Sequence, residues 1–554
     1  MKCGKGSKAQ LIFCMVGMVT LSLATNTHAD TPNEGVSLGE FTQYLGKQVP
    51  RWMDVYRIPG VVVSLVEGGR SVWEGAWGYA DLVKGRPLTV DTRCRVESIS
   101  KSVTAWGVLK LVQEGRLDLD APVEQYLKRF RFPSSAYSAE KVTIRRLLSH
   151  TAGLPLGTIG VRYPPEGPVP SLLEALRKDG YLMAEPGSGF TYSNTGFNLL
   201  ELLIEEVTGE EFSRYMEREI LQPLGMRRSS YSWNPLWEPP VPTGYSTSGD
   251  PIPVYVYPEK GAGGLFAPIG DIARFLRAEG GYTGTFQYTG TFQAKGFGSA
   301  VIPPVKIPGS NGPEGLNTAP VLFPHREDDI PATTNGSESF STAQVLRRET
   351  RELLFEPQTP VPGLYGWAFP FYGFGHFIEY FSDGTKAVSH GGQGSGWMSH
   401  FHLVPSAGDG IVILTNSQRS WPLFAYLLRD WARWKGYSSP GMSRIIAGEW
   451  ILMGVVAVLL VLCGWKGLVF LRELIQKRRK LSLTLRHGGV PRVVSLSLSA
   501  LLLLVLGWAR AQDYLFIQSV FPRTATGLGV ALFLSALLLL AYALFPRVLP
   551  GGGN

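Results

Sequence analysis

The sequence of 554 residues is long enough for more than one domain, and its 44% hydrophobic content fits globular parts combined with membrane segments. The net charge is +8, but much of it lies beside apolar segments near the C-terminus, where orientation in a bilayer and contact with anionic lipid explain it better than nucleic-acid binding does. Two of the four cysteines lie in the N-terminal leader and a third in an apolar segment, so no structural disulfide is expected.

The N-terminus has the features of an export signal. Three lysines among the first eight residues precede an apolar run at 11–23, and a Thr-His-Ala tripeptide stands directly before Asp30. No cysteine stands in a lipobox-like context, so we expect residues 1–29 to be cleaved as a signal peptide rather than lipidated.

The C-terminal residues 441–554 form a predicted membrane region. It holds three apolar stretches, at residues 445–471, 493–508 and 528–545. The first and third are long enough to cross a bilayer of about 30 Å, and the second is marginal. The segment between the first two is rich in arginine and lysine, so the positive-inside rule makes it cytoplasmic. This agrees independently with export of the N-terminus, and we predict a multi-pass plasma-membrane protein with residues 30–440 on the extracytoplasmic side.

The exported region begins with a helix, a hairpin and a second helix. The spacing of apolar residues predicts an amphipathic helix over 36–58. Two apolar runs joined by EGGR at 67–70 predict a β-hairpin. The next segment, CRVESISKSVTAWGVLKLVQEG from Cys94 to Gly115, is too apolar to be solvated all round, so we expect a buried helix that ends at Gly115.

Helical patterns dominate the middle of the exported region, and strand patterns return near its end. Residues 281–340 are rich in Gly, Thr, Pro and Ser with little periodicity and resemble a flexible insertion. The other expected elements are helices after Pro122, across 142–235, within 261–276 and at 341–354, strands at 367–380, 387–390, 397–404 and 410–416, and a closing amphipathic helix at 421–434. Strands at both ends with a helical middle predict an α/β (α+β) fold, in which a helical subdomain lies over a sheet and a site lies between the two.

Ser98 and Lys101 form a Ser-x-x-Lys pair at the start of the buried helix. Residues three apart lie on the same helix face, so a hydroxyl and an amine meet there. Burial and the positive helix N-terminus both disfavour the ammonium, which moves the pKa of Lys101 down from about 10.4 towards a value at which the amine accepts a proton. The pair predicts a nucleophile beside its base.

The same spacing also has a structural explanation, because Ser98 is a suitable helix N-cap beside an incidental lysine. A second copy, Ser138 to Lys141, stands in the polar run SSAYSAEK with no apolar helix after it, and we expect a solvated loop there. The pattern alone is therefore weak, and the other motifs decide between the two explanations.

Several blocks, in this order, resemble the serine beta-lactamase-related family, which includes class C beta-lactamases, DD-peptidases and related esterases. They are VESISKSVTAWGVLKLVQEGRLDLDAPV, TIRRLLSHTAGLP, EPGSGFTYSNTGFNLLELLIEEVTG, LQPLGMRRSS, GAGGLFAPIGDIARFL and VSHGGQGSG. They cover residues 36 to about 436 apart from the insertion, and their co-occurrence is far more specific than any one motif. The resemblance implies an antiparallel sheet flanked by helices, with a helical subdomain, as in beta-lactamases and transpeptidases.

Carried over residue by residue, the resemblance makes Ser98 the acylated nucleophile and Lys101 its amine partner. Tyr192 and Asn194 match the family's Tyr-x-Asn element. The phenol, with its pKa pulled below about 10 by an ammonium, would relay a proton, and the amide would hold Lys101 or the substrate. Taken alone, these two residues also fit a packed aromatic and a turn residue.

His390-Gly391-Gly392 takes the place of the family's Lys-Thr-Gly strand. The resemblance implies that His390 contacts a substrate carboxylate or hydrogen-bonding group and that the glycines let the strand approach the substrate. The backbone N–H groups of Ser98 and Gln393 would form the oxyanion hole, in which each donor is worth about 3 kcal/mol.

Two departures from the family pattern matter. Histidine in place of lysine is similar to DD-peptidases and esterases rather than class C beta-lactamases, and nothing matches the deacylating glutamate of class A enzymes, so Tyr192 or Lys101 would activate the water. His150 matches a family block, but its spacing gives it no catalytic partner, and we interpret it as structural. His400 and His402 alternate on a predicted strand without a third ligand, so no metal site is predicted.

The leading hypothesis is a membrane-anchored extracytoplasmic serine hydrolase that forms an acyl-enzyme with a small-molecule or peptide amide or ester, with peptidase or esterase activity ranked above beta-lactamase activity. No cofactor and no nucleic-acid partner are expected. An alternative is a membrane sensor in which a penicillin or peptide acylates Ser98, although the short cytoplasmic loop carries no effector domain or His-Glu-x-x-His motif. An α/β-hydrolase, suggested by the His-Gly-Gly run, lacks the required Gly-x-Ser-x-Gly elbow.

Overall fold

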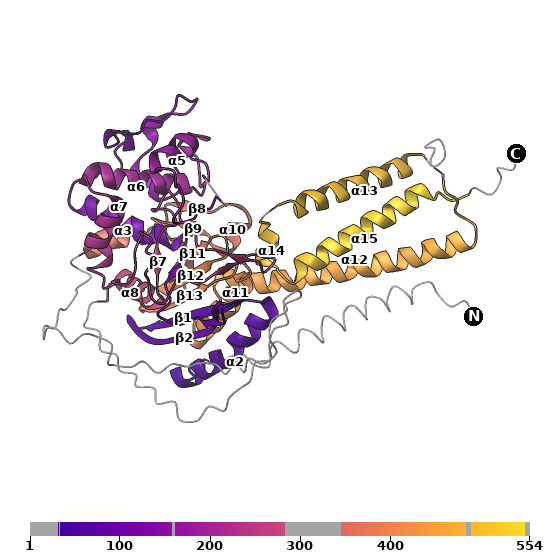
Figure 1. Cartoon of the computed structure of the whole chain (residues 1–554), viewed down its shortest axis with the longest axis horizontal. Coiled ribbons are helices and arrows are strands. Elements are labelled where there is room, and N and C mark those ends of the chain that lie inside the picture. Colours follow the sequence, from indigo (N-terminus) through magenta and orange to yellow (C-terminus); the bar gives the residue numbers. More distant parts are fainter. Residues whose placement is uncertain are drawn as a thin grey trace. The chain divides into compact units, whose positions relative to one another are not determined.

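The computed structural model describes Pro32 and residues 34–157, 161–282, 345–482, 489–512 and 514–548. The chain forms two compact units, one from Glu34 to Met442 and the other beginning at Ser443. In Figure 1 the first unit is a mixed body of helices and strands, and the second is a set of long helices. The predicted signal peptide (1–29) and residues 283–340 of the predicted insertion lie outside the described residues.

The first unit is built on one antiparallel sheet. Within the described ranges it has nine strands in the order β3-β2-β1-β13-β12-β11-β10-β9-β8. They are β1 (Gly60–Glu67), β2 (Arg70–Asp81), β3 (Arg86–Pro87), β8 (Thr359–Pro360), β9 (Phe371–Tyr372), β10 (Phe377–Tyr380), β11 (Lys386–Gln393), β12 (Met398–Val404) and β13 (Asp409–Thr415). β1 pairs with β13 from Val61↔Thr415 to Val66↔Gly410. The predicted α/β (α+β) fold, with a sheet completed by both ends of the region, is confirmed.

The predicted hairpin is formed by β1 and β2. Their turn contains Gly68 at φ 53° and Gly69 at φ 74°, a left-handed conformation that glycine adopts without a steric penalty. Further along the chain, the predicted helix at 341–354 is shorter than expected. It appears as α9 (Arg348–Glu352), followed by a single 3-10 turn.

Helices cover both faces of the sheet. Four of them pack against the strands: α2 (Leu38–Tyr56), α3 (Ile99–Gln113), α8 (Ile269–Glu279) and α11 (Trp421–Trp434). Along β13, Val412 and Leu414 join the core cluster that includes α3 and α8, whereas Ile411 and Ile413 are buried outside that cluster. Since successive strand residues point to opposite faces, α3 and α8 lie on one face, and α2 with α11 lies on the other.

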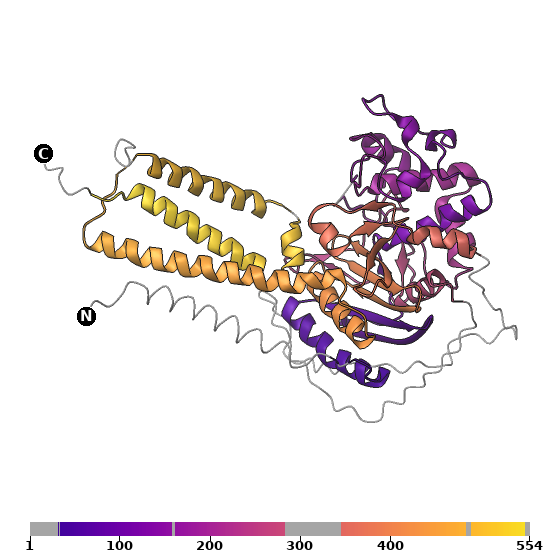
Figure 2. The same ribbon diagram turned by 180° about the vertical axis from the view of Figure 1, so that it is seen from behind.

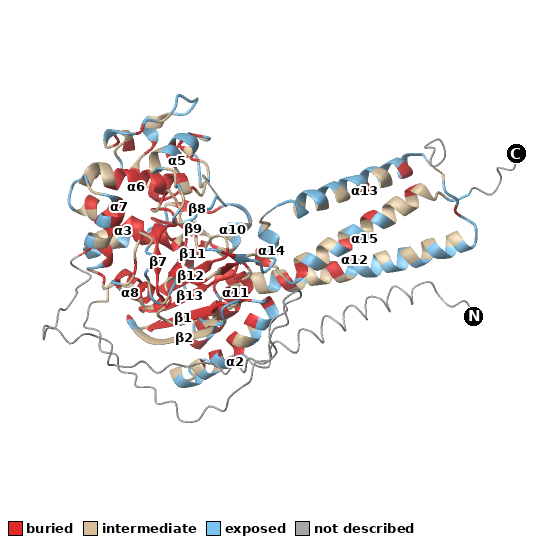
Figure 3. Ribbon diagram, viewed as in Figure 1, coloured by how far each residue is buried: buried red, intermediate tan, exposed pale blue. Residues whose placement is uncertain are grey.

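A helical subdomain lies beside α3 (Figure 1). Its helices are α4 (Ile144–Leu148), α5 (Leu172–Asp179), α6 (Asn194–Thr208) and α7 (Phe212–Met216). α6 contacts α3 and each of the other three helices. Figure 3 shows α3 and α6 buried over much of their length, and every residue of α3 from Ile99 to Leu109 is buried. A helix without a solvated face removes its lysine from water.

The segment 367–380 differs from the predicted single strand. Its start belongs to a short helix, α10 (Gly363–Ala368), and β9 and β10 follow as separate short strands. The turn between them contains Gly375 at φ 70°, where a Cβ would lie 2.9 Å from the backbone oxygen of Lys101. The chain bends here because the turn packs directly on α3, which a continuous strand would not allow.

Among the residues that the structure describes, the second unit contains three helices that are long and apolar enough to cross a membrane. They are α12 (Arg444–Ile475), α13 (Gly489–Arg510) and α15 (Thr524–Leu544). α15 lies between the other two in Figures 1 and 2 and contacts both. The Ser499 hydroxyl donates to the carbonyl of Ala536 at 2.8 Å, which links α13 to α15. α13, whose predicted span was marginal, has 22 residues and reaches about 33 Å.

The buried histidines of β12 predict a loss of stability in mild acid. His402 is almost fully buried, and burial lowers its pKa from 6.5 to about 3. Between these values the unfolded chain binds a proton that the native protein does not, so the free energy of unfolding falls by about 1.4 kcal/mol per pH unit for this group as the pH decreases. We expect the urea midpoint of the first unit, followed by tryptophan fluorescence, to drop from pH 7 to pH 5, and His402→Phe to reduce this slope. An unchanged slope in the variant would contradict the prediction.

Candidate active site

Ser98 stands at the N-cap position of α3 but does not cap the helix. Its side chain accepts no capping hydrogen bond from the backbone N–H groups of the first turn. Instead, its Oγ lies 3.1 Å from Lys101 Nζ. The preceding residue, Glu97, has a left-handed φ of 49°, a strained conformation for a residue with a side chain and one that is enriched at functional turns. A plain N-cap therefore does not explain the position of this hydroxyl.

Lys101 is a fully buried amine with three polar neighbours. Its Nζ lies 3.1 Å from Ser98 Oγ, 2.7 Å from Asn194 Oδ1 and 2.8 Å from the backbone oxygen of Ala262. Burial lowers the pKa of Lys101 to about 7, and the negative charge of Glu97 opposes this shift. The amine is therefore neutral in about half of the molecules near pH 7.

The chemistry of these three neighbours, Ser98, Asn194 and Ala262, determines from which of them a neutral Lys101 amine can accept a proton. An amide oxygen and a carbonyl oxygen accept hydrogen bonds but have no proton to give. The two N–H bonds of neutral Lys101 therefore point to Asn194 and Ala262. The ammonium form of Lys101 donates to Ser98 Oγ as well, whereas the neutral form would direct its lone pair to the Ser98 hydroxyl and accept from it.

Tyr192 completes the group around Ser98. Its hydroxyl interacts with the Ser98 side chain, and its ring centroid lies 5.0 Å from Lys101 Nζ. Burial raises the pKa of Tyr192, and the interaction with Ser98 offsets only part of this rise. The expected lowering does not occur because loss of water is the largest influence on the pKa of this phenol. Tyr192 is thus a protonated phenol at neutral pH.

Gly392 allows β11 to pass close to the residues that precede Ser98. A Cβ at this position would lie 2.1 Å from the backbone oxygen of Val96 and 2.3 Å from Ser399 Oγ. No side chain fits in that space, so the strand requires glycine here. The backbone N–H of Gln393, which we predict to form the oxyanion hole with that of Ser98, follows directly after this contact.

His390 lies in the site with both ring nitrogens engaged by the protein. Nδ1 is 2.8 Å from the backbone oxygen of Gly391, and Nε2 is 3.1 Å from the Tyr372 hydroxyl. Burial and the charge of Lys101 lower the pKa of His390 well below 6.5. In the neutral ring Nδ1 donates to the carbonyl and Nε2 accepts from Tyr372. The predicted contact with substrate stays a prediction, and this arrangement offers it no positive charge.

The remaining predicted positions lie away from the reacting group or support it. His150 is buried, and its Nδ1 accepts a hydrogen bond from the backbone N–H of Ser193 at 3.2 Å, which fits a structural role. Its ring lies 4.3 Å from that of Tyr192, between centroids. In the second Ser-x-x-Lys copy, the Lys141 amine is more than half exposed and pairs with Glu185 at 2.6 Å.

His400 and His402 are buried side by side on β12, with ring centroids 6.0 Å apart. Across the parts of the chain that the structure describes, no three His, Cys, Asp or Glu side chains gather in an arrangement that would hold a metal ion.

Two residues of the site were missed by sequence reasoning. Ala262 acts through its backbone carbonyl, so its side chain carries no signal, and only its place in the GAGG block marks the position. Tyr372 binds His390 from a segment that was expected to be one continuous strand. Neither role follows from local spacing, since both partners come from distant parts of the chain.

Comparison with known proteins adds a family match. A family model described as Beta-lactamase matches residues 47–432. Esterase EstB of Burkholderia gladioli is 36% identical over 183 residues, which cover 31% of this chain and 46% of EstB. Protein flp of Staphylococcus aureus (strain MRSA252) is 30% identical over 204 residues, which cover 36% of this chain and 40% of that protein. The matched part thus spans less than half the length of either relative.

Among solved structures, the octameric penicillin-binding protein homologue from Pyrococcus abyssi has a TM-score of 0.51. It is 24% identical and covers 71% of this chain and 78% of its own. At this identity the likeness shows a shared fold.

The pKa of Lys101 predicts that Ser98 becomes more reactive as the pH rises. Below about pH 7 the ammonium has no lone pair for the Ser98 proton, and above it the neutral amine does. We expect the rate of Ser98 labelling by a fluorophosphonate to rise through a midpoint near pH 7 and then level off. Lys101→Arg keeps a cation throughout this range and should lower the rate by about 100-fold or more. A flat profile for the wild type would rule out Lys101 as the base.

The close approach of β11 predicts different outcomes for two neighbouring glycines. A Cβ at position 392 meets backbone at 2.1 Å, whereas one at position 391 lies 3.3 Å from His400 Nδ1. Gly392→Ala should therefore displace the strand and lower the labelling rate of Ser98 by about tenfold or more. Gly391→Ala serves as the matched control and should stay within about threefold of wild type. Equal rates for the two variants would show that this contact does not position the site.

Proposed function

Because the chain belongs to the Beta-lactamase family, a family of serine hydrolases, we propose that an amide or ester substrate acylates Ser98 and that water then releases the acyl group. The observation that carries this proposal is the buried Lys101 amine, whose Nζ lies within hydrogen-bonding distance of Ser98 Oγ, Asn194 Oδ1 and the backbone oxygen of Ala262.

In the acylation step Ser98 Oγ attacks the substrate carbonyl, and its proton passes to Lys101 Nζ. The backbone N–H groups of Ser98 and Gln393 stabilise the negative charge that develops on the carbonyl oxygen. When the bond to the leaving group breaks, Tyr192 gives its proton to the departing alcohol or amine and regains one from the Lys101 ammonium. Lys101 is the proposed base, because the pKa of Tyr192 is raised by burial and that of Lys101 is about 7.

In the second step water attacks the acyl group on Ser98. Neutral Lys101 accepts the proton of that water, directly or through Tyr192, and the proton returns to Ser98 Oγ as the acyl bond breaks. The two steps leave every residue in its starting protonation state, so the cycle needs no additional reagent.

We infer that the preferred substrates are esters or uncharged amides. The ring of His390 is neutral, and both of its nitrogens are hydrogen-bonded within the protein. A substrate group next to this ring is therefore favoured when it is uncharged rather than a free carboxylate. The name of one relative, esterase EstB, points the same way. Penicillins and peptides with a C-terminal carboxylate rank lower, because their charge would be buried without a partner here.

We further propose that α12, α13 and α15 anchor the hydrolase in a plasma membrane. The basic run from Arg472 to Lys480 at the end of α12 supports a cytoplasmic position for that end. The first unit precedes the other end of α12 in the sequence, so one crossing by α12 places it on the extracytoplasmic side.

Intact-mass measurement of the full chain tests the proposed nucleophile. Wild type, Ser98→Ala and the matched control Ser138→Ala, from the second Ser-x-x-Lys copy, are exposed to p-nitrophenyl butyrate and to a fluorescent penicillin. We expect a butyryl adduct and ester turnover with wild type and Ser138→Ala, and a loss of turnover of about 10⁴-fold with Ser98→Ala.

The penicillin arm separates the remaining hypotheses. A slow or absent penicillin adduct beside rapid ester turnover supports the ester assignment, whereas rapid penicillin turnover would support a beta-lactamase. A stable adduct without turnover of either reagent would support the sensor. Full activity of Ser98→Ala would overturn the proposal altogether.

A further inference from the structure

A buried ion pair flanks the turn that presents Ser98. Arg95 and Glu97 are 1% and 2% exposed, and Arg95 Nε lies 2.8 Å from Glu97 Oε1. A buried pair of charges is unfavourable unless its remaining donors and acceptors are also paired. Here the guanidinium also donates to the backbone oxygens of Tyr255, at 2.5 Å, and Gly263, at 3.5 Å. The pair is therefore tied to the loop that leads to Ala262 and Gly263.

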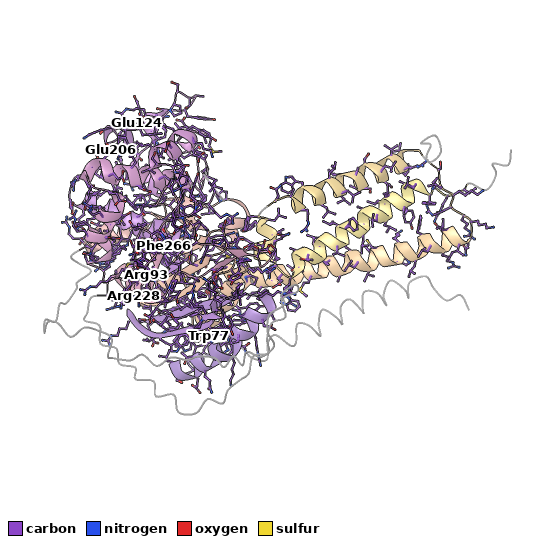
Figure 4. All side chains as sticks on the ribbon, in the orientation of Figure 1. Trp77, Arg93, Glu124, Glu206, Arg228 and Phe266 are labelled. Carbon is purple, nitrogen blue, oxygen red and sulfur yellow. The ribbon has the colours of Figure 1, made fainter. Side chains whose placement is uncertain are left out.

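Aromatic rings enclose the guanidinium of Arg95. Its central carbon lies 4.2 Å from the ring centroid of Tyr255, 4.6 Å from that of Tyr257 and 5.0 Å from that of Phe266. Phe266 belongs to β7 (Phe266–Ala267), which pairs with β4 (Cys94–Arg95), and it is labelled near the middle of the first unit in Figure 4. These contacts hold the guanidinium of Arg95 in one position. Since Glu97 pairs with that guanidinium, its carboxylate is held in position too.

The carboxylate of Glu97 accepts a hydrogen bond on each oxygen from a tyrosine. The Tyr255 hydroxyl lies 3.0 Å from Oε1, and the Tyr257 hydroxyl lies 3.0 Å from Oε2. Burial and the charge of Glu97 raise the pKa of both phenols, which keeps them protonated as donors. Glu97, whose backbone is strained, is thus also held in place through its carboxylate.

The same carboxylate touches the chain that follows the predicted oxyanion strand. A Cβ at Gly394 would lie 2.2 Å from Glu97 Oε1, and one at Gly392 would lie 2.9 Å from Glu97 Cβ. The Tyr255 hydroxyl, which donates to Glu97, also accepts a hydrogen bond from the backbone N–H of Ser395 at 2.9 Å. Glu97 therefore joins the turn before Ser98 to the end of β11.

Glu97 also supplies a negative charge near the base. Among the titratable groups that face Lys101, the carboxylate of Glu97 favours the ammonium. His150 and His390 are neutral because burial and Lys101 lower their pKa values, and Tyr192 is a protonated phenol. The pKa of Lys101 thus reflects two opposing effects: burial lowers it, and the negative charge of Glu97 raises it.

We propose that Glu97, fixed by its arginine and two tyrosine partners, is the positioning residue of the reaction. It holds the strained turn that presents Ser98, sets the approach of β11 to that turn, and supplies a buried negative charge near the Lys101 amine. This inference rests on the proposed function, because it assumes that Ser98 is the nucleophile and Lys101 its base.

The rate of fluorophosphonate labelling, measured against pH on the full chain, tests this role. Wild type is compared with Glu97→Gln, with Tyr257→Phe, and with Glu74→Gln as the control, since Glu74 is a partly buried carboxyl on β2 that interacts with Arg274. For Glu97→Gln we expect the plateau rate to fall about tenfold or more and the midpoint to move down by roughly half a pH unit or more. Tyr257→Phe should lower the plateau about threefold without moving the midpoint. The profile of labelling rate against pH for Glu74→Gln should match that of the wild type.

The shift of the midpoint distinguishes positioning from a merely structural role. A Glu97→Gln profile with the wild-type midpoint and plateau would overturn the inference while leaving the proposed function standing, and so would an equal loss in Glu74→Gln. If Glu97→Gln gives no cooperative unfolding transition, Tyr257→Phe decides, and an unchanged plateau there would overturn the inference. A wild type that is not labelled at any pH would overturn the proposed function, and this inference with it.

Discussion

The site depends on a lysine amine that folding removes from water. Lys101 lies on a helix buried on all sides, so its ammonium is costly and its pKa falls to about 7. Asn194 and the carbonyl of Ala262 take both N–H bonds of the neutral form, which keeps the buried amine paired without a charge. Of its three hydrogen-bonding neighbours, Ser98 alone has a proton to give. In the proposed mechanism, a residue that is usually a cation acts as the base for this one hydroxyl.

Close backbone packing keeps this group together. β11 can lie against the turn before Ser98 because position 392 has no side chain, and the turn at Gly375 packs on the backbone of Lys101 for the same reason. α6 brings Asn194 from the helical subdomain, while the loop before β7 brings Ala262. The reacting group therefore lies where the sheet, α3 and the helical subdomain meet, and none of these elements could form it alone.

The distribution of charge bears on both mechanism and substrate. Negative charge lies on Glu97, directly before Ser98 in the chain, where Arg95 and two tyrosines compensate it. The pair formed by His390 and Tyr372 is neutral, and its hydrogen bonds are satisfied within the protein. A buried charge thus influences the base, while the substrate would meet uncharged groups. This division underlies the proposed preference of this Beta-lactamase family member for uncharged substrates.

The sequence by itself determined the fold class, the long apolar helices and the pairing of Ser98 with Lys101, because each follows from local periodicity: residues three apart share a helix face, and a run of about 20 apolar residues can cross a bilayer. Only the tertiary structure decided which groups are charged. Tyr192 has a raised pKa where a lowered one was expected, and His390 is a capped neutral ring. Ala262 contributes a backbone carbonyl that its side chain does not signal. The physical reason is that desolvation and hydrogen-bond partners come from segments far apart in the chain, which only folding brings together.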